Sequence, residues 1–248
     1  MMTANTGSDT AGQVPGGPDE QVARIRSLSF DCYGTLIDWI TGIRGALETL
    51  AASGGSLPID QGEFFDTYLE VEAETEAGPY MSYKEVLTSA QAELARRFGL
   101  TVPPERARVL ADSVPGWKPF DDTNPALARL KERFRLGILS NIDNDLFAAT
   151  ARQFEPAIGQ FDFVITAEDV GSYKPGHGHF KRLLQTVVDD QGTNLHVAQS
   201  LFHDGAPAAE LGIPFVWINR RGEVNETIAK PLAELSNLTE LADMLCAQ

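Results

Sequence analysis

The chain has 248 residues, of which 43% are hydrophobic and 22% are charged, and these proportions are ordinary for a globular protein. This length allows one large domain, or a core with a smaller second domain. The net charge of −15 argues against a nucleic-acid partner, because phosphate binding needs a surplus of Lys and Arg. It is compatible with a small anionic substrate, which needs only a few local cations. No apolar run approaches the ~20 residues of a membrane span, so no membrane partner is expected.

The two cysteines, Cys32 and Cys246, lie far apart and form no CxxC or Cys/His metal pattern. This usage indicates a reducing, cytoplasmic setting and predicts no metal ligands among the cysteines and histidines. Residues 1–21 carry Gly, Thr, Ser, Pro and Asp with almost nothing to bury. We therefore expect these residues to form a disordered tail.

The first expected element is a short strand that ends at Asp31. Its apolar residues are Ile25, Leu28 and Phe30, and the glycine and threonine that follow Asp31 in Gly34-Thr35 stop the strand. Taken alone, an Asp at the end of a strand more often caps the next turn than catalyses a reaction. The later segments of the chain favour catalysis.

Residues 41–115 are expected to be helical throughout. Apolar residues recur at helical spacing in several segments, which are separated by a Gly/Ser loop at Ala52–Pro58 and by Gly78-Pro79. Asp60 is the expected N-cap of the second helix, and Ser82 begins the next. An insertion placed directly after Asp31 must rise from that end of the sheet, so it can close over the site as a cap and exclude water.

From Phe120 onwards, expected helices and strands alternate. A helix begins at Asn124-Pro125. The strands that follow are expected at Leu136–Leu139, Phe161–Thr166, His196–Ala198 and Phe215–Ile218. The helices between them are expected at Asp143–Phe154, Phe180–Val188 and Pro207–Leu211. This alternation predicts an α/β fold with a doubly wound, parallel, Rossmann-like sheet, built from residues 22–40 and 116–248, with residues 41–115 as the inserted helical cap domain.

Polar side chains follow three of the later strands at the edge where Asp31 lies. Ser140 and Asn141 follow the second strand, Lys174 lies in a loop after the third, and Asp204 follows the fourth. The carboxyl ends of parallel strands meet at one edge, so these side chains are expected to gather around Asp31. Lys174 can keep Asp31 ionised and attract an anionic substrate, and Ser140 can hold an oxyanion or a carboxylate.

Taken in order, Asp31, Ser140, Lys174 and Asp204 resemble the four motifs of the haloacid dehalogenase superfamily, whose members are hydrolases with an aspartate nucleophile. The resemblance covers residues 24–245 and matches the helical insertion to that superfamily's cap. In detail, the chain is similar to the 2-haloacid dehalogenase branch, and this resemblance suggests a homodimer. The segments that carry the closer similarity are Phe30-Asp31-Cys32-Tyr33-Gly34-Thr35-Leu36, Ile138-Leu139-Ser140-Asn141, Tyr173-Lys174-Pro175 and Val216-Trp217-Ile218-Asn219-Arg220.

Two positions distinguish dehalogenation from phosphate chemistry. Tyr33 stands where phosphatases of the superfamily carry an acid that protonates the leaving group, and Gln199 stands where they carry an acidic Mg²⁺ ligand. Halide leaves without a proton or a metal, so a carboxylate paired with Lys174 is a sufficient nucleophile. The favoured reading therefore needs no cofactor.

The resemblance implies that Asp31 displaces halide from a small 2-halocarboxylic acid and forms an aspartyl ester, which water hydrolyses with help from Lys174 and Asp204. The residues expected to contact the substrate are Tyr33, Thr35, Arg44, Lys118, Ser140, Asn141 and Gln199. The family's cap arginine has no counterpart between Arg44 and Arg96, so Arg44, Lys118 or Lys84 would have to supply that cation. The glutamates of the cap, Glu70, Glu72, Glu74 and Glu76, are read as a solvated face.

Two other functions remain open at this point. The first is a Mg²⁺-dependent phosphatase that acts on small phosphate esters. The second is a non-catalytic relative that binds a metabolite. Activity that requires Mg²⁺ would favour the first, and a biological role that survives Asp31→Asn would favour the second.

Overall fold

A computed structural model describes residues 22–53, 60–188 and 192–246. The predicted tail at residues 1–21, and residues 54–58 of the predicted Gly/Ser loop, lie outside the described residues. Six strands form one sheet in the order β3-β2-β1-β4-β5-β6, and every neighbouring pair is parallel. The strands are β1 (Ile25–Phe30), β2 (Arg135–Ser140), β3 (Phe163–Thr166), β4 (Thr193–Ala198), β5 (Phe215–Ile218) and β6 (Ala233–Leu235). The predicted parallel α/β sheet is confirmed.

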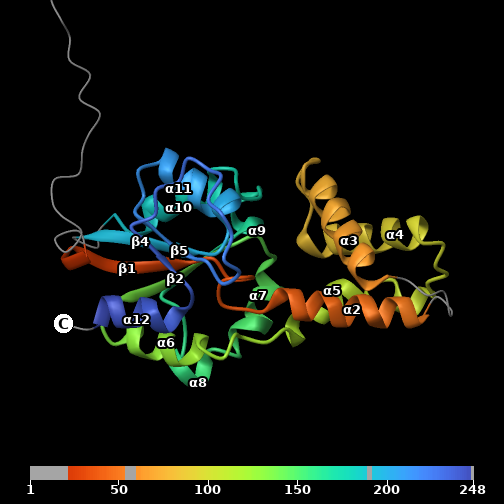
Figure 1. Ribbon diagram of the computed structural model, residues 1–248, viewed down its shortest axis with the longest axis horizontal. Helices are drawn as coiled ribbons and strands as arrows, with labels where there is room; N and C mark the ends of the chain where they lie inside the picture. The colour runs from red at the N-terminus through yellow and green to blue at the C-terminus, as the bar shows by residue number, and fades with distance from the viewer. Residues whose placement is uncertain (1–21, 54–59, 189–191, 247–248) are drawn as a thin grey trace, which may run out of the picture.

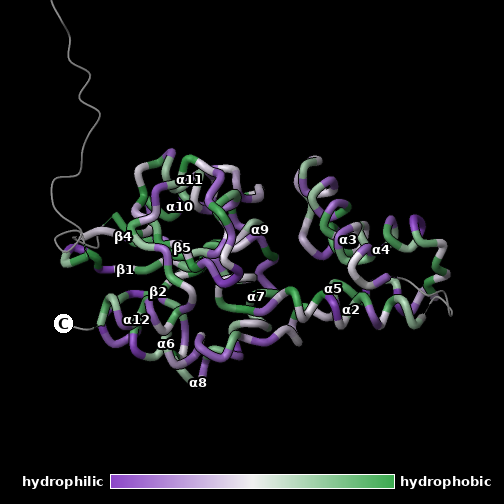
Figure 2. Tube along the Cα trace, viewed as in Figure 1, coloured by the Kyte–Doolittle hydropathy of each residue, from purple (hydrophilic) through white to green (hydrophobic). Residues whose placement is uncertain are grey.

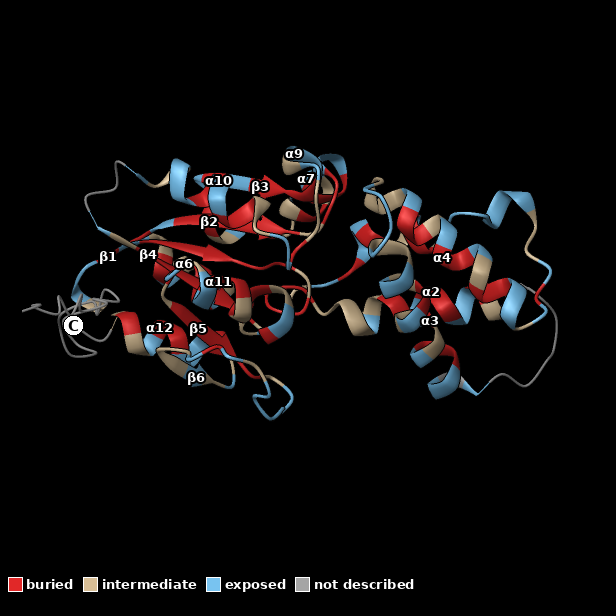
Figure 3. Cartoon of the chain, turned by 90° about the horizontal axis from the view of Figure 1, so that it is seen from above, coloured by how far each residue is buried: buried red, intermediate tan, exposed pale blue. Residues whose placement is uncertain are grey.

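Helices cover both faces of this sheet (Figure 1). One face carries α10 (Gly178–Thr186) and α11 (Ala206–Glu210), and the other carries α6 (Thr123–Lys131), α8 (Glu155–Ile158) and α12 (Leu238–Cys246). Successive side chains of a strand point to opposite faces, so Ile138 packs into the core beside α6 and α12 and Leu139 packs into the core beside α10. The inner strands β1, β2, β4 and β5 are therefore mostly buried from both sides (Figure 3), and β2 and β5 carry mostly hydrophobic residues (Figure 2).

All regular structure in the described part of residues 41–115 is helical, as the sequence predicts. These helices lie beyond one end of the sheet (Figure 1). They are α2 (Trp39–Ser53), α3 (Gln61–Glu76), α4 (Tyr83–Arg97) and α5 (Val109–Ser113), with short 3₁₀ turns η1 (Pro104–Arg106) and η2 (Val114–Gly116). Asp60 caps α3 and Ser82 caps α4, as predicted. Of the helices in the described ranges, none is long and apolar enough to cross a membrane.

Side chains of the sheet domain hold the beginning of α4. Asp143, which is buried, accepts hydrogen bonds from the backbone N–H groups of Tyr83 and Lys84 at 2.8 and 2.9 Å. The hydroxyl of Tyr173 donates to the carbonyl of Met81 at 2.8 Å. The two contacts with Asp143 satisfy N–H groups that the first turn of a helix leaves without a partner. They also fix one end of α4 beside the loop that carries Lys174.

Some predicted boundaries are wrong. The expected helix Asp143–Phe154 ends earlier than predicted, because α7 spans only Asn144–Ala151 and α8 is a separate helix that begins after Phe154. The expected strand at Phe161 begins at Phe163. Phe161 packs its ring against Phe147 and Phe154, so its apolar character serves the helix layer and not the sheet. Two further elements, β6 and α12, lie in the part of the chain after Ile218, where the sequence reading assigned no element.

Arg220 follows β5 and forms a clip between distant parts of the chain. Its guanidinium makes two contacts of 3.0 Å with the carboxylate of Asp122, donates to the carbonyl of Thr35 at 2.9 Å and lies 3.9 Å from the centre of the Phe120 ring. Asp122 also accepts the N–H of Leu238 at 2.6 Å. This Arg220 clip fixes the backbone of the turn that follows Asp31.

Candidate active site

Asp31 lies at the end of β1, where the strand passes into a tight turn. Gly34 has a φ of 103°, a conformation that glycine adopts without strain, and it turns the chain so that Thr35 faces back to Asp31. The Thr35 hydroxyl donates to Asp31 Oδ2 at 2.9 Å and accepts the N–H of Gln199 at 2.9 Å. Asp31 is buried, with a relative exposure of 8% for the whole residue, and the hydrogen bond from Thr35 helps to orient its carboxylate.

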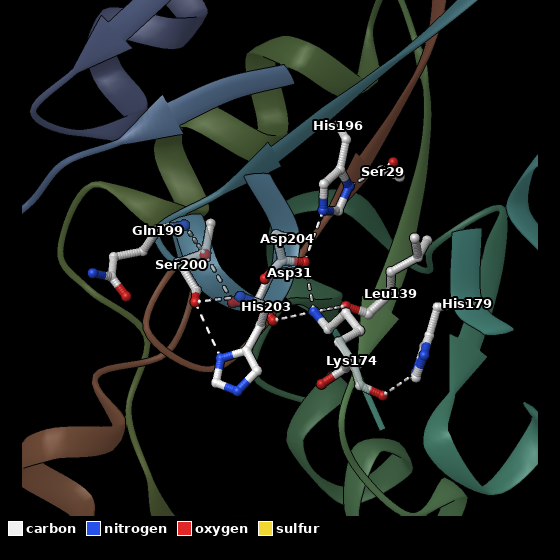
Figure 4. A network of polar contacts seen from close by, with 12 residues as sticks. Ser29, Asp31, Leu139, Lys174, His179, His196, Gln199, Ser200, His203 and Asp204 are labelled. Atoms are coloured by element: carbon white, nitrogen blue, oxygen red, sulfur yellow. Dashed lines mark hydrogen bonds and ion pairs between the residues drawn. The ribbon is translucent and has the colours of Figure 1, made fainter. Parts of the chain in front are cut away.

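Lys174 brings its ammonium group to three acceptors. Its Nζ donates to Asp31 Oδ1 at 2.9 Å, to Asp204 Oδ1 at 2.7 Å and to the carbonyl of Leu139 at 2.9 Å (Figure 4). The Asn141 amide holds the Lys174 backbone on both sides, donating to its carbonyl at 3.0 Å and accepting its N–H at 2.7 Å. Because an ammonium group has three donors, every donor of Lys174 is used in this arrangement.

Asp204 lies in a short π-helical turn, η3 (Leu201–Gly205), after β4. Its Oδ1 accepts hydrogen bonds from Lys174 and from His196 Nε2, the latter at 2.9 Å. Its Oδ2 is buried and has no hydrogen-bond partner among the described residues. A carboxylate oxygen left in this state is costly unless a ligand or water uses it, which makes Oδ2 a candidate reactive atom.

The charges of this cluster divide the roles of its two carboxylates. Burial raises the pKa of Asp31, and the charge of Asp204 raises it further, whereas Lys174 and Thr35 act in the opposite direction. Burial also acts to raise the pKa of Asp204, but Lys174 and His196 overcome it and hold that pKa well below its usual range. Burial would lower the pKa of Lys174, yet Asp204 and Asp31 together raise it. Before the reaction, the cluster therefore contains the Lys174 cation and an ionised Asp204.

A cavity of about 340 Å³ opens in front of Asp31, between the sheet domain and the helices of the insertion. Ser140 lies in its wall, and the buried Ser140 Oγ has no hydrogen-bond partner among the described residues. The carbonyl of Ser140 accepts a hydrogen bond from His179 Nε2 at 3.1 Å. Burial lowers the pKa of His179 to about 4, so His179 is a neutral donor that fixes Ser140 while leaving its hydroxyl free for a ligand.

His203 lies in the same wall, beside Asp204. Its Nδ1 is 3.1 Å from the hydroxyl of Ser200, and its backbone N–H donates to the same oxygen at 3.0 Å (Figure 4). Burial lowers the pKa of His203. The ring is therefore neutral near neutral pH and is oriented by Ser200.

The insertion contributes an acidic wall to this cavity. Glu72 and Glu76 both line it, and Glu72 Oε1 accepts hydrogen bonds from the hydroxyls of Tyr68 and Tyr83 at 2.6 Å each. Burial, followed by the charge of Glu72, raises the pKa of Glu76 to about 8. The expectation of a solvated glutamate face is therefore wrong for these two residues.

The spacing of the glutamates explains this division. Residues four apart lie on one face of a helix, so Tyr68, Glu72 and Glu76 share the face of α3 that turns to the cavity. The other two glutamates, Glu70 and Glu74, lie on another face of α3. There Arg97 contacts Glu70 at 3.9 Å and Glu74 at 2.9 Å. The spacing of four residues between Tyr68, Glu72 and Glu76 was the signal in the sequence that could have placed the two glutamates on one face of the helix.

The structure does not bring to Asp31 the three cations that were expected to replace the family's cap arginine. The exposed Arg44 lies over the ring of Phe65, 4.8 Å from its centre, and Lys118 lines a separate hollow of about 710 Å³. Lys84 pairs with Asp145 at 2.7 Å. None of the three is among the residues that line the cavity in front of Asp31.

The remaining predicted contacts, Tyr33 and Gln199, do line that cavity. The hydroxyl of Tyr33 is 2.9 Å from Thr150 Oγ1, so it is directed to the protein and not to a leaving group beside Asp31. The Gln199 side chain donates to Glu223 at 3.1 Å. Across the described ranges, no group of three or more His, Cys, Asp or Glu is arranged to hold a metal ion.

Sequence reasoning missed a buried polar group behind Asp204. Ser29, Asn194 and His196 are buried within strands that otherwise carry apolar residues. The available signal was the alternation of polar residues at positions 27 and 29 of one strand and 194 and 196 of the other. Their contact depends on the pairing of β1 with β4, which the sequence did not reveal.

Comparison with known proteins places the chain among relatives of similar length. A family model described as haloacid dehalogenase-like hydrolase matches residues 25–197. The (S)-2-haloacid dehalogenase of Pseudomonas putida is 28% identical over 225 residues, covering 89% of this chain and 96% of that protein. The enzyme of the same name from Pseudomonas sp. (strain YL) is 25% identical, covering 89% and 94%.

A solved structure shows the same fold. The L-2-haloacid dehalogenase of Xanthobacter autotrophicus, determined with chloropropionic acid covalently bound, superposes with a TM-score of 0.75 at 18% identity, over 90% of this chain and 99% of that one. The family model covers well over half of the chain. The chain therefore belongs to the haloacid dehalogenase-like hydrolase family.

Proposed function

We propose that this hydrolase cleaves the carbon–halogen bond of a small 2-halocarboxylic acid, through a covalent ester on Asp31. The observation that carries the proposal is the buried Lys174 ammonium group, which contacts Asp31 at 2.9 Å and Asp204 at 2.7 Å. A nucleophile held ionised by a neighbouring cation suits a reaction whose leaving group needs no proton. The relatives named as 2-haloacid dehalogenases support the same reaction.

In the first step, an Asp31 carboxylate oxygen attacks the carbon that bears the halogen. A new carbon–oxygen bond forms as the carbon–halogen bond breaks, and halide leaves with the bonding electron pair. Lys174 and Thr35 orient the carboxylate for this attack and exclude bulk water from it. The step ends with a neutral ester in place of the Asp31 carboxylate.

In the second step, water attacks the Asp31 carbonyl carbon of the ester. Asp204 Oδ2, which lacks a partner among the described residues, takes a proton from this water and passes it to the departing alkoxide of the hydroxy acid. Asp31 then releases its own proton to solvent and returns to the carboxylate form. The net reaction consumes one water and releases halide, a proton and a 2-hydroxy acid.

The substrate carboxylate is expected to bind through Ser140 Oγ, the buried hydroxyl that has no partner among the described residues. The Asn141 side chain, which the sequence also assigned to the substrate, is engaged on both sides by the Lys174 backbone. We therefore assign Asn141 the role of holding Lys174 in place. Tyr33 and the apolar side chains of Trp39, Leu69 and Trp117 shape the space around the reacting carbon.

Two assays run together test this function. Halide release is measured with a panel of 2-halocarboxylates, beside phosphate release from small phosphate esters with and without Mg²⁺. Halide release that persists in EDTA is expected, and phosphate release alone would instead establish the phosphatase alternative. A single turnover in ¹⁸O-labelled water should place label in Asp31 before it appears in the product, and unlabelled Asp31 would rule out the ester.

A further inference from the structure

A polar ladder runs through the core behind Asp204. It comprises Ser27, Ser29, Asn194 and His196, which lie at paired positions of β1 and β4, Ser27 opposite Asn194 and Ser29 opposite His196. Asn194 Nδ2 donates to Ser27 Oγ at 3.1 Å, and Ser29 Oγ donates to Asn194 Oδ1 at 2.8 Å. Ser29 Oγ also lies 2.9 Å from His196 Nδ1 (Figure 4). The ladder thus leads directly to the ring of His196.

The surroundings of the ladder are apolar. The ring of His196 is fully buried and lies between those of Phe180 and Phe215, with ring centres 5.3 and 6.1 Å away. Burying polar groups in such a layer costs free energy unless each is hydrogen-bonded, and apolar residues of similar size are often at least as stable. The ladder is therefore poorly explained by the stability of the core alone.

The ladder ends on the reacting cluster. His196 Nε2 is 2.9 Å from Asp204 Oδ1, and an ionised carboxylate only accepts hydrogen bonds, so Nε2 is the donor in this contact. His196 and Lys174 thus both occupy Oδ1 and leave Oδ2 as the oxygen without a partner. Ser29 holds the opposite side of the ring and prevents it from turning.

We propose that His196 is a positioning residue for ester hydrolysis, which holds Asp204 Oδ1 so that Oδ2 stays free to take a proton from the attacking water. This inference rests on the proposed function. His196 becomes important after the first step, when Asp31 is a neutral ester and Asp204 is the one carboxylate of the pair that still attracts Lys174. Without His196, the Asp204 carboxylate can rotate and offer both oxygens to Lys174. With His196, one oxygen remains available to the water.

The test separates the two chemical steps in His196→Leu. Leucine suits the apolar layer, and Ser29 keeps Asn194 as a partner, so the variant is expected to fold. With a 2-halocarboxylate in rapid mixing, we expect a burst of about one halide per active site, followed by steady turnover about 10- to 100-fold slower than in the unaltered protein, the range for loss of a hydrogen bond to a charged group. Mass spectrometry should find the ester on the peptide that carries Asp31.

Two further variants keep the result decisive. His196→Gln places an amide N–H near the position of Nε2 and should restore hydrolysis at least partly, with less ester accumulating. His179→Leu is a matched control, because His179 is also a buried histidine but contacts the Ser140 carbonyl and not Asp204. Any loss of activity in this control should come without accumulated ester.

The inference is overturned if His196→Leu lowers burst and steady turnover in equal proportion and carries no ester on Asp31. It is also overturned if His179→Leu accumulates ester to the same extent, because burial of a histidine would then suffice. Failure of the unaltered protein to release halide from any member of the panel is a different outcome, since it overturns the proposed function and the inference together.

Discussion

Replacing Lys174 with methionine should damage both the activity and the fold, because it leaves two carboxylates buried together without their cation. At contacts of 2.9 and 2.7 Å, an effective dielectric constant of about 20 gives an attraction of about 6 kcal/mol for each pair. The cost of removing three charges from water offsets much of this attraction, so the expected loss of unfolding free energy is about 3–5 kcal/mol. One of the two carboxylates must then bind a proton.

Urea unfolding and halide release measure these two effects. The rate of halide release should fall by about 10³-fold or more, because 1.4 kcal/mol of barrier corresponds to a factor of ten and the Asp31 nucleophile is partly protonated in the variant. Adding Asp204→Asn to Lys174→Met removes one of the two competing charges. This double variant should recover about 1–3 kcal/mol of stability without recovering activity.

Lys84→Met is the matched control, because the shortest ion pair of Lys84 is with the exposed Asp145 at 2.7 Å, and its contact with the buried Asp143 is longer, at 4.0 Å. Its effect on unfolding should stay within about 1 kcal/mol. The reasoning is refuted if Lys174→Met stays within about 1 kcal/mol of the unaltered protein and releases halide within about tenfold of its rate. It is equally refuted if Asp204→Asn makes the Lys174 variant less stable.

Four other outcomes follow from the geometry and the charges. Asp143→Ala removes two hydrogen bonds from the start of α4, and losing such a cap costs about 0.5–2 kcal/mol. KM should therefore rise by about 2- to 30-fold in steady-state assays, with kcat little changed, whereas an unchanged KM would mean that this contact does not hold the cap over the substrate. Because the pKa of Asp31 is raised by burial and by Asp204, first-turnover halide release should lose half its rate at a pH above 3.8, and a midpoint below that value would contradict the assignment. Glu76 has a folded pKa raised from 4.5 to about 8, so its contribution to stability is complete below pH 4.5 and is lost as the pH rises through 8. Urea unfolding of Glu76→Gln at about pH 5 and 9 should show its advantage over the unaltered protein growing by at least about 1.4 kcal/mol, and parallel stability curves would count against this. Arg220→Lys should lower the unfolding free energy by about 1–3 kcal/mol, because lysine cannot reproduce the paired contacts with Asp122. The neighbouring Arg221→Lys, which alters an exposed ion pair with Glu223, should change it by less than about 0.5 kcal/mol.

The alternation of strands and helices could be predicted from the sequence because most of the buried strands contain a short apolar run between helical segments. β5 (Phe215–Ile218) is an example, since all four of its residues are buried. β6 (Ala233–Leu235) could not be predicted from the sequence, because it has only three residues and none of them is fully buried. Such an edge strand lacks the apolar pattern on which the prediction depends.

The candidate site divides in the same way. The sequence predicted that Asp31, Lys174 and Asp204 would lie together because each is a charged residue that follows a strand, and the structure places them in contact. The partners of Asp204 in the core were missed, because Ser29 and His196 are 167 positions apart in sequence and meet only through strand pairing. Arg44 and Lys84 were misplaced for a related reason, since helix periodicity gives the spacing of a helix's faces but not which face turns to the cavity. Lys118 lies in the loop after η2, where no periodicity indicates its direction.

The Arg220 clip makes the order of synthesis relevant to the chemistry. Asp31 and Lys174 both emerge from the ribosome before Arg220, and Leu238, which shares Asp122 with it, emerges later still. A nascent chain that has passed Lys174 therefore holds both reacting charges while the turn at Thr35 still lacks the contacts that fix its backbone. The contacts that fix the turn after Asp31 should thus form late in translation, so that incomplete chains carry the Asp31 carboxylate without the contacts from Arg220 to Thr35.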